Sequence, residues 1–179
     1  MTKVWNFLPN PEDAAGSLRR AIVRVSGGVE KGLHCPCCGQ YAKLYPRYIN
    51  PEIAAWLTTL VSAYEANRTW YHVGNEKLRQ VKGGDYAKLL HWRLIKSHPT
   101  KAGYWKPTKR GRRFASGRLR VKRKALIYDG KFVGLTGRKI TIDDAYKTKF
   151  SREEILRNPN VPPEIKKKKK RTVRRRRRR

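Results

Sequence analysis

The sequence predicts an α+β fold, and three observations support that prediction. Residues 50–67 combine helix-capping residues with apolar side chains at helical spacing, which is the pattern of an amphipathic helix. Short β-like segments then alternate with helical segments as far as Gly117. Beyond that point, an Asp-Gly dipeptide separates apolar segments at 125–128 and 131–135, which predicts a two-residue β-hairpin.

Composition divides the 179 residues into five segments. The last fourteen residues contain twelve Lys or Arg and no acid, so they offer almost nothing apolar to bury and are expected to be disordered. The segments are an N-terminal segment at 1–33, a cysteine element at 34–48, a helix-rich domain at 49–117, a hairpin and helix extension at 118–158, and a disordered polybasic tail at 159–179.

Positive charge dominates the chain, which has a formal net charge of +31. The residues before Lys166 still carry +19, so the tail alone does not explain the excess. Such a charge favours a nucleic-acid partner, because phosphate neutralisation with counterion release is its commonest use. No lipidation motif, signal-peptide pattern or run of about 20 apolar residues favours a membrane partner. We therefore expect a cytoplasmic protein, acting in the host cell if its source is viral.

The first two predicted elements differ in how well the pattern defines them. Residues 17–26 form either a short helix or an edge strand, and the sequence leaves both open. In the helix at 50–67, Asn50 is a good N-cap, Pro51 takes the first helical position, and Glu52 favours the positive end of the helix dipole. Its apolar face should consist of Ile53, Leu57, Leu60, Val61 and Tyr64.

Turn and capping residues delimit the remaining elements. They predict a strand at 70–73, a helix at 76–82 after Asn75, a helix at 86–93 capped by Asp85, strands at 94–96 and 104–106 around a loop at 98–103, a basic helix at 109–116 capped by Thr108, a strand at 139–142, and a helix from the capping box of Ser151 and Glu154 to Arg157. The inner face of the helix at 86–93 should hold Tyr86, Leu89, Leu90 and Leu94.

The order of elements at 50–117 resembles that of a winged helix-turn-helix domain. Residues 86–95 look like the end of a recognition helix running into the first wing strand, and residues 103–114 look like the second wing strand followed by a Thr-x-x-Gly helix start. Over residues 34–150 the chain resembles a group of bacteriophage proteins of unknown function. Those proteins combine a Cys-Pro-x-Cys-Gly knuckle, a winged-helix-like region and a Val-x-Lys-x-Ala-x-x-Tyr-Asx-Gly stretch, here at 121–130. The resemblance implies a winged helix-turn-helix-like domain with a cysteine knuckle, and it brings no catalytic residues.

A recognition helix needs an outward polar face to reach bases or phosphates, and Lys88, His91 and Arg93 are the candidates for base or groove contact. Trp92 also falls on the outward side of this helix, but tryptophans bury large areas, so we expect Trp92 and Trp105 in the core. Residues 101–124 contain eleven basic residues and no acid. The expected phosphate contacts are Lys101, Lys109, Arg110, Arg112, Arg113, Arg118, Arg120, Lys122, Arg123 and Lys124, and in the tail Lys166, Lys167, Lys168, Lys169, Lys170, Arg171, Arg174, Arg175, Arg176, Arg177, Arg178 and Arg179.

The cysteine element contains one Cys-x-x-Cys pair, Cys35 and Cys38, followed by Gly39. Two thiolates on a tight turn are half of a structural zinc site, so the sequence predicts structural Zn²⁺ at these residues. The alternative is a reduced cysteine turn with no metal. Candidates for the other ligands are His34, Cys37 and His72, with His91 and His98 further along the chain.

No arrangement of residues favours an enzyme. Asp143-Asp144 and Glu153-Glu154 lie where helix N-termini favour acids, and no phosphate loop or nucleophile elbow is present. We therefore expect a non-enzymatic nucleic-acid-binding protein that prefers double-stranded DNA to RNA. The alternatives are a structural, genome-packaging or host-interacting viral protein and an RNA-binding or ribosome-associated protein. The sequence does not determine the oligomeric state.

Overall fold

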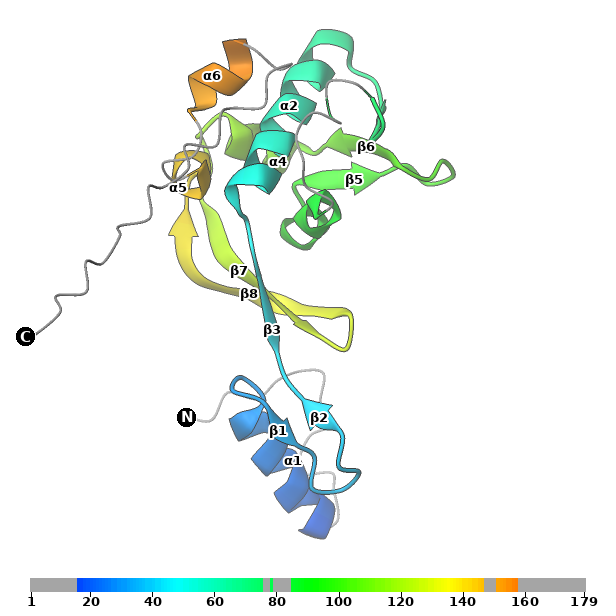
Figure 1. Ribbon diagram of the computed structural model, residues 1–179, viewed down its shortest axis with the longest axis vertical. Coiled ribbons are helices and arrows are strands. Elements are labelled where there is room, and N and C mark those ends of the chain that lie inside the picture. The colour runs from blue at the N-terminus through cyan, green and yellow to red at the C-terminus, as the bar shows by residue number, and fades with distance from the viewer. Residues whose placement is uncertain (1–15, 76–77, 79–84, 147–150, 158–179) are drawn as a thin grey trace, which may run out of the picture.

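The computed structural model describes residues 16–75, 78, 85–146 and 151–157. Helices and strands alternate through these residues, which confirms the α+β class (Figure 1). The elements are α1 (Gly16–Gly28), β1 (Leu33–His34), β2 (Tyr41–Ala42), β3 (Tyr45–Tyr48), α2 (Pro51–Asn67), β4 (Tyr71–His72), the 3₁₀ helix η2 (Tyr86–Trp92), β5 (Ile95–Ser97), β6 (Tyr104–Pro107), α4 (Lys109–Ala115), β7 (Val121–Tyr128), β8 (Lys131–Ile140), α5 (Ile142–Tyr146) and α6 (Arg152–Arg157).

Helix α2 is the centre of the fold and confirms the helix predicted at 50–67. The Asn50 side chain accepts a hydrogen bond from the Ile53 amide at 2.8 Å, and Pro51 occupies the first turn. The helix ends where Arg68 takes the left-handed conformation and its amide donates to Tyr64 O at 2.7 Å. Helices α4, α5 and α6 pack around α2, together with β6 and η2. This packing buries most of α2 in the larger of the two hydrophobic clusters formed by the described residues.

A three-stranded antiparallel sheet with the order β4–β6–β5 packs beside α2. Its strands confirm those predicted near 70–73, 94–96 and 104–106, and the loop at 98–103 joins β5 to β6. The helix predicted at 76–82 lies outside the described residues, except for Leu78, which is helical and buried. This sheet and α2 position the start of α4.

The helix predicted at 86–93 is a 3₁₀ helix, so its expected inner face is partly wrong. With three residues per turn, Leu89 and Trp92 share one face with Tyr86, and Leu90 leaves it. Leu89 and Trp92 are buried, whereas Leu90 is 40% exposed. The Trp92 indole donates to Lys122 O at 2.6 Å, so Trp92 is a core residue, as expected from its size. Asp85 makes no capping hydrogen bond and instead pairs with the side chain of Lys88.

The second three-stranded sheet has the order β3–β7–β8 and contains the predicted hairpin. Asp129 and Gly130 both have positive φ, at 46° and 70°, as a type I′ turn requires. The strands extend beyond the predicted segments, because β8 continues through bulges to Ile140. The strand predicted at 139–142 is therefore the end of β8 and the start of α5, and Asp143 and Asp144 lie in the first turn of α5.

The N-terminal part of the described chain forms a smaller unit with its own hydrophobic cluster. Residues 17–26, for which the sequence left a helix and a strand open, form part of helix α1. This helix packs with the β1–β2 hairpin. The cluster consists of Val25, Val29, Ala42, Leu44 and, from β7, Leu126. Strand β3 runs from this unit to the rest of the fold (Figure 1). No helix among the described residues has the length and apolar character that crossing a bilayer requires.

Candidate nucleic-acid interface

The basic helix α4 is held by the Thr-x-x-Gly sequence that begins it. The Thr108 hydroxyl accepts a hydrogen bond from the Gly111 amide at 2.9 Å and donates to Arg93 O at 2.8 Å. A Cβ at Gly111 would lie 1.9 Å from Leu94 O, so only glycine allows this close approach. The first turn of α4 is therefore fixed against the backbone that leads into β5.

Two hollows of about 490 and 400 Å³ flank α4 and share Lys109 and Arg112 in their walls. Of the described residues that line the two hollows, Glu65 is the single acidic one. We call this surface the basic groove. Its eight cationic side chains are Arg93, Lys96, Lys106, Lys109, Arg110, Arg112, Arg113 and Arg118.

Two lysines of the basic groove face each other across neighbouring strands. Lys96 on β5 is directly opposite Lys106 on β6 in the antiparallel register. Like charges in this position destabilise a sheet. The Lys106 ammonium lies 4.2 Å from the ring centroid of Trp70, which offsets part of the cost. A bound anion would relieve the remaining repulsion.

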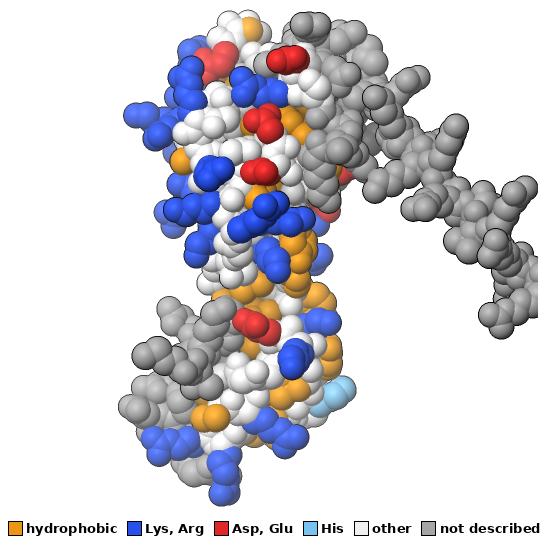
Figure 2. All heavy atoms as spheres, turned by 90° about the vertical axis from the view of Figure 1, so that its left-hand side faces the viewer, with side chains coloured by type: hydrophobic (Ala, Val, Ile, Leu, Met, Phe, Trp, Pro, Cys, Tyr) orange, Lys and Arg blue, Asp and Glu red, His pale blue; other side chains and the backbone are white. Residues whose placement is uncertain are grey.

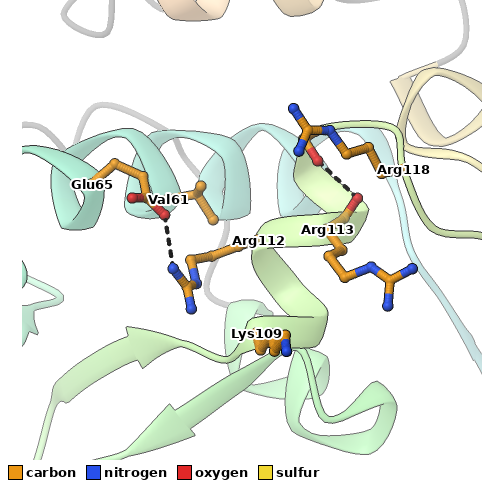
Figure 3. Close-up of a pocket in the computed structure, with 7 residues that line it drawn as sticks. Val61, Glu65, Lys109, Arg112, Arg113 and Arg118 are labelled. Atoms are coloured by element: carbon orange, nitrogen blue, oxygen red, sulfur yellow. Dashed lines mark hydrogen bonds and ion pairs between the residues drawn. The ribbon is translucent and has the colours of Figure 1, made fainter.

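Some of the groove cations also serve the fold. Arg112 reaches Glu65 on α2, with Nη1 at 3.3 Å from Oε1, whereas the guanidinium groups of Arg113 and Arg118 lie away from Glu65 (Figure 3). The Nε of Arg110 donates to Trp92 O at 3.2 Å. Lys109 and Arg113 are exposed and form no ion pair within the described part of the chain. Arg93, Lys96 and Arg118 are likewise exposed and outside these ion pairs, so five groove cations are available to an external anion.

The other predicted contact residues lie away from the groove or are engaged elsewhere. Lys88 pairs with Asp85, and the His91 ring stacks on Phe132 with centroids 5.3 Å apart. Burial lowers the pKa of His91, and the nearby charges of Arg47 and Lys88 lower it further. The Lys101 ammonium, in the β5–β6 loop, lies 5.9 Å from the Tyr104 ring centroid. Arg120 and Lys122 are exposed. The cationic groups of Arg123 and Lys124 lie over the Tyr48 ring. The tail lies outside the described residues.

Sequence reasoning missed Lys96 and Lys106, although both line the basic groove. Each is an isolated lysine in a short strand, and their proximity arises from pairing between strands. The only signal was the expected pairing of 94–96 with 104–106 around a tight loop. On the second sheet, Lys122 and Lys139 form another opposed lysine pair. Over the upper part of the face drawn in Figure 2, Lys and Arg dominate the charged side chains.

The cysteine element forms a tight turn at the end of the β1–β2 hairpin. The Gly39 amide donates to Cys35 O at 2.8 Å, and Gly39 has φ +71°. Backbone amides of Cys37 and Cys38 lower the pKa of Cys35, as thiolate-binding turns do. Burial raises the pKa of Cys37, and nearby thiols raise it further.

The described residues do not assemble three or more metal-binding side chains at the cysteine turn. His72 lies in β4, where its ring contacts Tyr104 with centroids 5.0 Å apart. His34 is next to the turn, and its Nδ1 lies 2.9 Å from Gly39 O. Among the described residues, the predicted fuller ligand set is therefore not brought together.

Comparison with known proteins gives no independent guide to the function of these surfaces. No family model matches the chain, and neither the curated proteins nor the solved structures include a significant match. The resemblance to bacteriophage proteins therefore stays a prediction. The basic groove and the charge of the chain are the features that bear on function.

Proposed function

We propose that the chain is a non-enzymatic nucleic-acid-binding protein that holds double-stranded DNA mainly through its phosphates, along the basic groove beside α4. The observation that carries this proposal is the lining of the groove, where eight cations accompany one acid. Glu65 already pairs with Arg68 and Arg112, so it neutralises little of the remaining charge. A polyanion supplies the missing negative charge and releases its counterions as it binds.

The groove suits a phosphate backbone better than it suits bases. Tyr64 is the one aromatic residue among the described residues of its lining. The guanidinium groups of Arg68 and Arg112 lie over the Tyr64 ring, 5.6 and 5.8 Å from its centroid. Contacts to phosphates carry no sequence information by themselves. We therefore expect binding with strong salt dependence and modest sequence preference.

The arrangement of elements supports the winged helix-turn-helix-like part of the proposal. Helix α2, strand β4, helix η2, the β5–β6 pair and helix α4 follow one another in the expected order, and the helix expected at 76–82 lies outside the described residues except for Leu78. The loop at 98–103 takes the place of a wing, and it carries Lys101. We do not expect η2 to make the main base contacts, because Lys88 pairs with Asp85 and the His91 ring stacks on Phe132.

The polybasic tail adds a second, sequence-independent contribution in this proposal. Its twelve cations increase the rate of association and the number of phosphates neutralised. Deletion of residues 166–179 should reduce the salt dependence of binding and leave a folded body. An unchanged salt dependence after this deletion would contradict the role of the tail.

We also propose structural Zn²⁺ at Cys35 and Cys38. The amides of Cys37 and Cys38 that point to the Cys35 sulfur favour the thiolate form that binds zinc. Zinc at this turn would stabilise the β1–β2 hairpin, and it would supply no catalytic chemistry there.

A titration series with several polymers tests the proposal. Fluorescence anisotropy would compare a labelled DNA duplex, a duplex of random sequence, an RNA duplex and a single strand at several salt concentrations. We expect tight, salt-sensitive binding to both DNA duplexes with weaker binding to RNA. A large gap between one sequence and random DNA would favour a regulator, equal affinity would favour a packaging protein, and a preference for RNA would favour the RNA-binding alternative. Absence of binding to every polymer near physiological salt would refute the proposal.

A further inference from the structure

Two exposed aromatic side chains lie in one row across the β3–β7–β8 sheet. Tyr45 on β3 is opposite Ile127 on β7, and Ile127 is opposite Phe132 on β8. Residues that are opposite one another in a sheet place their side chains on the same face. Tyr45 and Phe132 are 47% and 46% exposed, so nearly half of each side chain faces solvent.

This row belongs to neither hydrophobic cluster of the described residues. Ile127 is buried, but it is part neither of the cluster around α2 nor of the smaller one beside α1. The His91 ring extends the row, because it stacks on Phe132 with an interplanar angle of 10°. Large exposed rings that lie together mark an interaction surface more often than a structural one. We call Tyr45, Ile127, Phe132 and His91 the aromatic row.

Cations surround the aromatic row. Arg47 lies two residues after Tyr45 on the same face of β3, opposite Ala125. Arg47 and Lys88 are both near enough to His91 to influence its charge. Tyr48, three residues after Tyr45, lies on the opposite face of β3, where Arg123 and Lys124 are each 5.7 Å from its ring centroid. On the face of the aromatic row, Tyr45 and Arg47 present a ring and a cation side by side.

Rings combined with cations are the chemistry that holds unpaired nucleotides. Bases stack on aromatic side chains, and neighbouring Lys and Arg hold the phosphates that link them. A purely apolar protein partner would have to desolvate Arg47 and Lys88, so the charges favour a polyanion with aromatic bases. A base inside a duplex is stacked on both faces and cannot use these rings.

We propose that the aromatic row is a binding surface for single-stranded nucleic acid, separate from the basic groove, and that Tyr45 and Phe132 each stack on one base. These rings lie on the two outer strands, about 10 Å apart, which is too far for both to sandwich one base. The inference extends the proposed function from duplex phosphates to unpaired bases. A strand that leaves an opened duplex could then contact the protein at two places.

The test compares a variant of the row with matched controls on two kinds of probe. Tyr45→Leu combined with Phe132→Leu keeps apolar bulk and removes the rings, and both positions are exposed, so the fold should persist. Tyr41→Leu is the control, because Tyr41 is 51% exposed but lies on β2, outside this sheet. The probes are labelled oligothymidylate, oligouridylate and a blunt duplex without unpaired ends. Circular dichroism would verify the fold, and the single variant Tyr45→Leu is the milder alternative.

We expect the double variant to bind single strands roughly tenfold or more weakly, with duplex affinity unchanged, while Tyr41→Leu alters neither. Comparison of oligothymidylate with oligouridylate shows whether the unpaired partner is DNA or RNA. Unchanged single-strand affinity in the double variant overturns the inference, as does an equal loss for duplex and single strand. Self-association of the wild type that disappears in the double variant also overturns it, because the row would then be a contact between two copies. Failure of the wild type to bind duplex DNA would refute only the proposed binding of duplex at the basic groove. The comparison of single-strand affinities between wild type and double variant does not depend on duplex binding.

Discussion

Removal of two cations from the basic groove tests how the protein binds DNA. Lys109 and Arg113 suit this test, because both lie on α4, both line the groove, and neither is in an ion pair within the described residues. Helix α4 should survive Lys109→Ala with Arg113→Ala. Its position depends on the Thr108 cap and on the buried Phe114 instead.

The size of the effect follows from counterion release. Each phosphate contact contributes about 0.9 to the slope of log K against log salt for duplex DNA. If Lys109 and Arg113 each neutralise one phosphate, the double variant should lower the magnitude of that slope by about 1.8. At about 0.15 M salt, the same relation predicts that the affinity for DNA falls roughly fivefold for each contact removed and roughly 30-fold when both are removed.

Fluorescence anisotropy with a blunt DNA duplex over a salt series measures both quantities. The control removes the same charge elsewhere, through Arg24→Ala with Lys31→Ala, two exposed residues beside the smaller hydrophobic cluster. The control should reduce affinity only slightly and leave the slope nearly unchanged. If the two double variants shift the slope equally, general charge and not the groove governs binding, and the reasoning is refuted.

Three further predictions concern stability and metal. Gly111→Ala should cost about 2–4 kcal/mol in urea unfolding, because its Cβ would lie 1.9 Å from Leu94 O, whereas Gly134→Ala, with nothing within 4 Å, should change little. Burial raises the pKa of Tyr146 from 10.0 to about 12, so the unfolded chain loses this proton first as the pH rises. As the pH rises from about 10 to about 12, the free energy of unfolding of the wild type should therefore fall by up to ~3 kcal/mol more than that of Tyr146→Phe. Identical pH profiles for the two proteins would contradict this prediction. Elemental analysis should find about one zinc per chain, lost in Cys35→Ser with Cys38→Ser, and a metal-free wild type of full stability would rule out the zinc site.

Local signals explain what the sequence could predict. The bounds of α2 follow from Asn50 and Pro51 at one end, and those of α4 from Thr108 and Gly117, because capping depends on residues within one turn. The hairpin follows from Asp129-Gly130, since few other dipeptides accept positive φ at both positions.

Longer-range pairing explains what the sequence could not predict. Strand β3 pairs with β7, about 80 residues further along the chain, and nothing within the cysteine element indicates that partner. The helix type of η2 was missed because apolar residues at 86, 89, 90 and 94 fit an α-helical face. The 3₁₀ face consists instead of residues 86, 89 and 92.

In the candidate site too, some residues could be predicted from local sequence and others only from the pairing of strands. Lys109 and Arg113 could be predicted from a cluster of basic residues in one short helix. Lys96 and Lys106 could not, because they become neighbours only when β5 and β6 pair. Charge patterns along the chain also do not reveal that the Arg110 guanidinium is bound to Trp92 O.

The separation of the hydrophobic interior into two clusters affects how the molecule unfolds. Within the described residues, the smaller cluster has five buried side chains, and β3 leads from it to α2. So few buried side chains confer little cooperativity of their own. Amide hydrogens of α1 should therefore exchange with solvent sooner than those of α2. The region beside α1 then melts as a separate step, while the part that carries the basic groove stays folded.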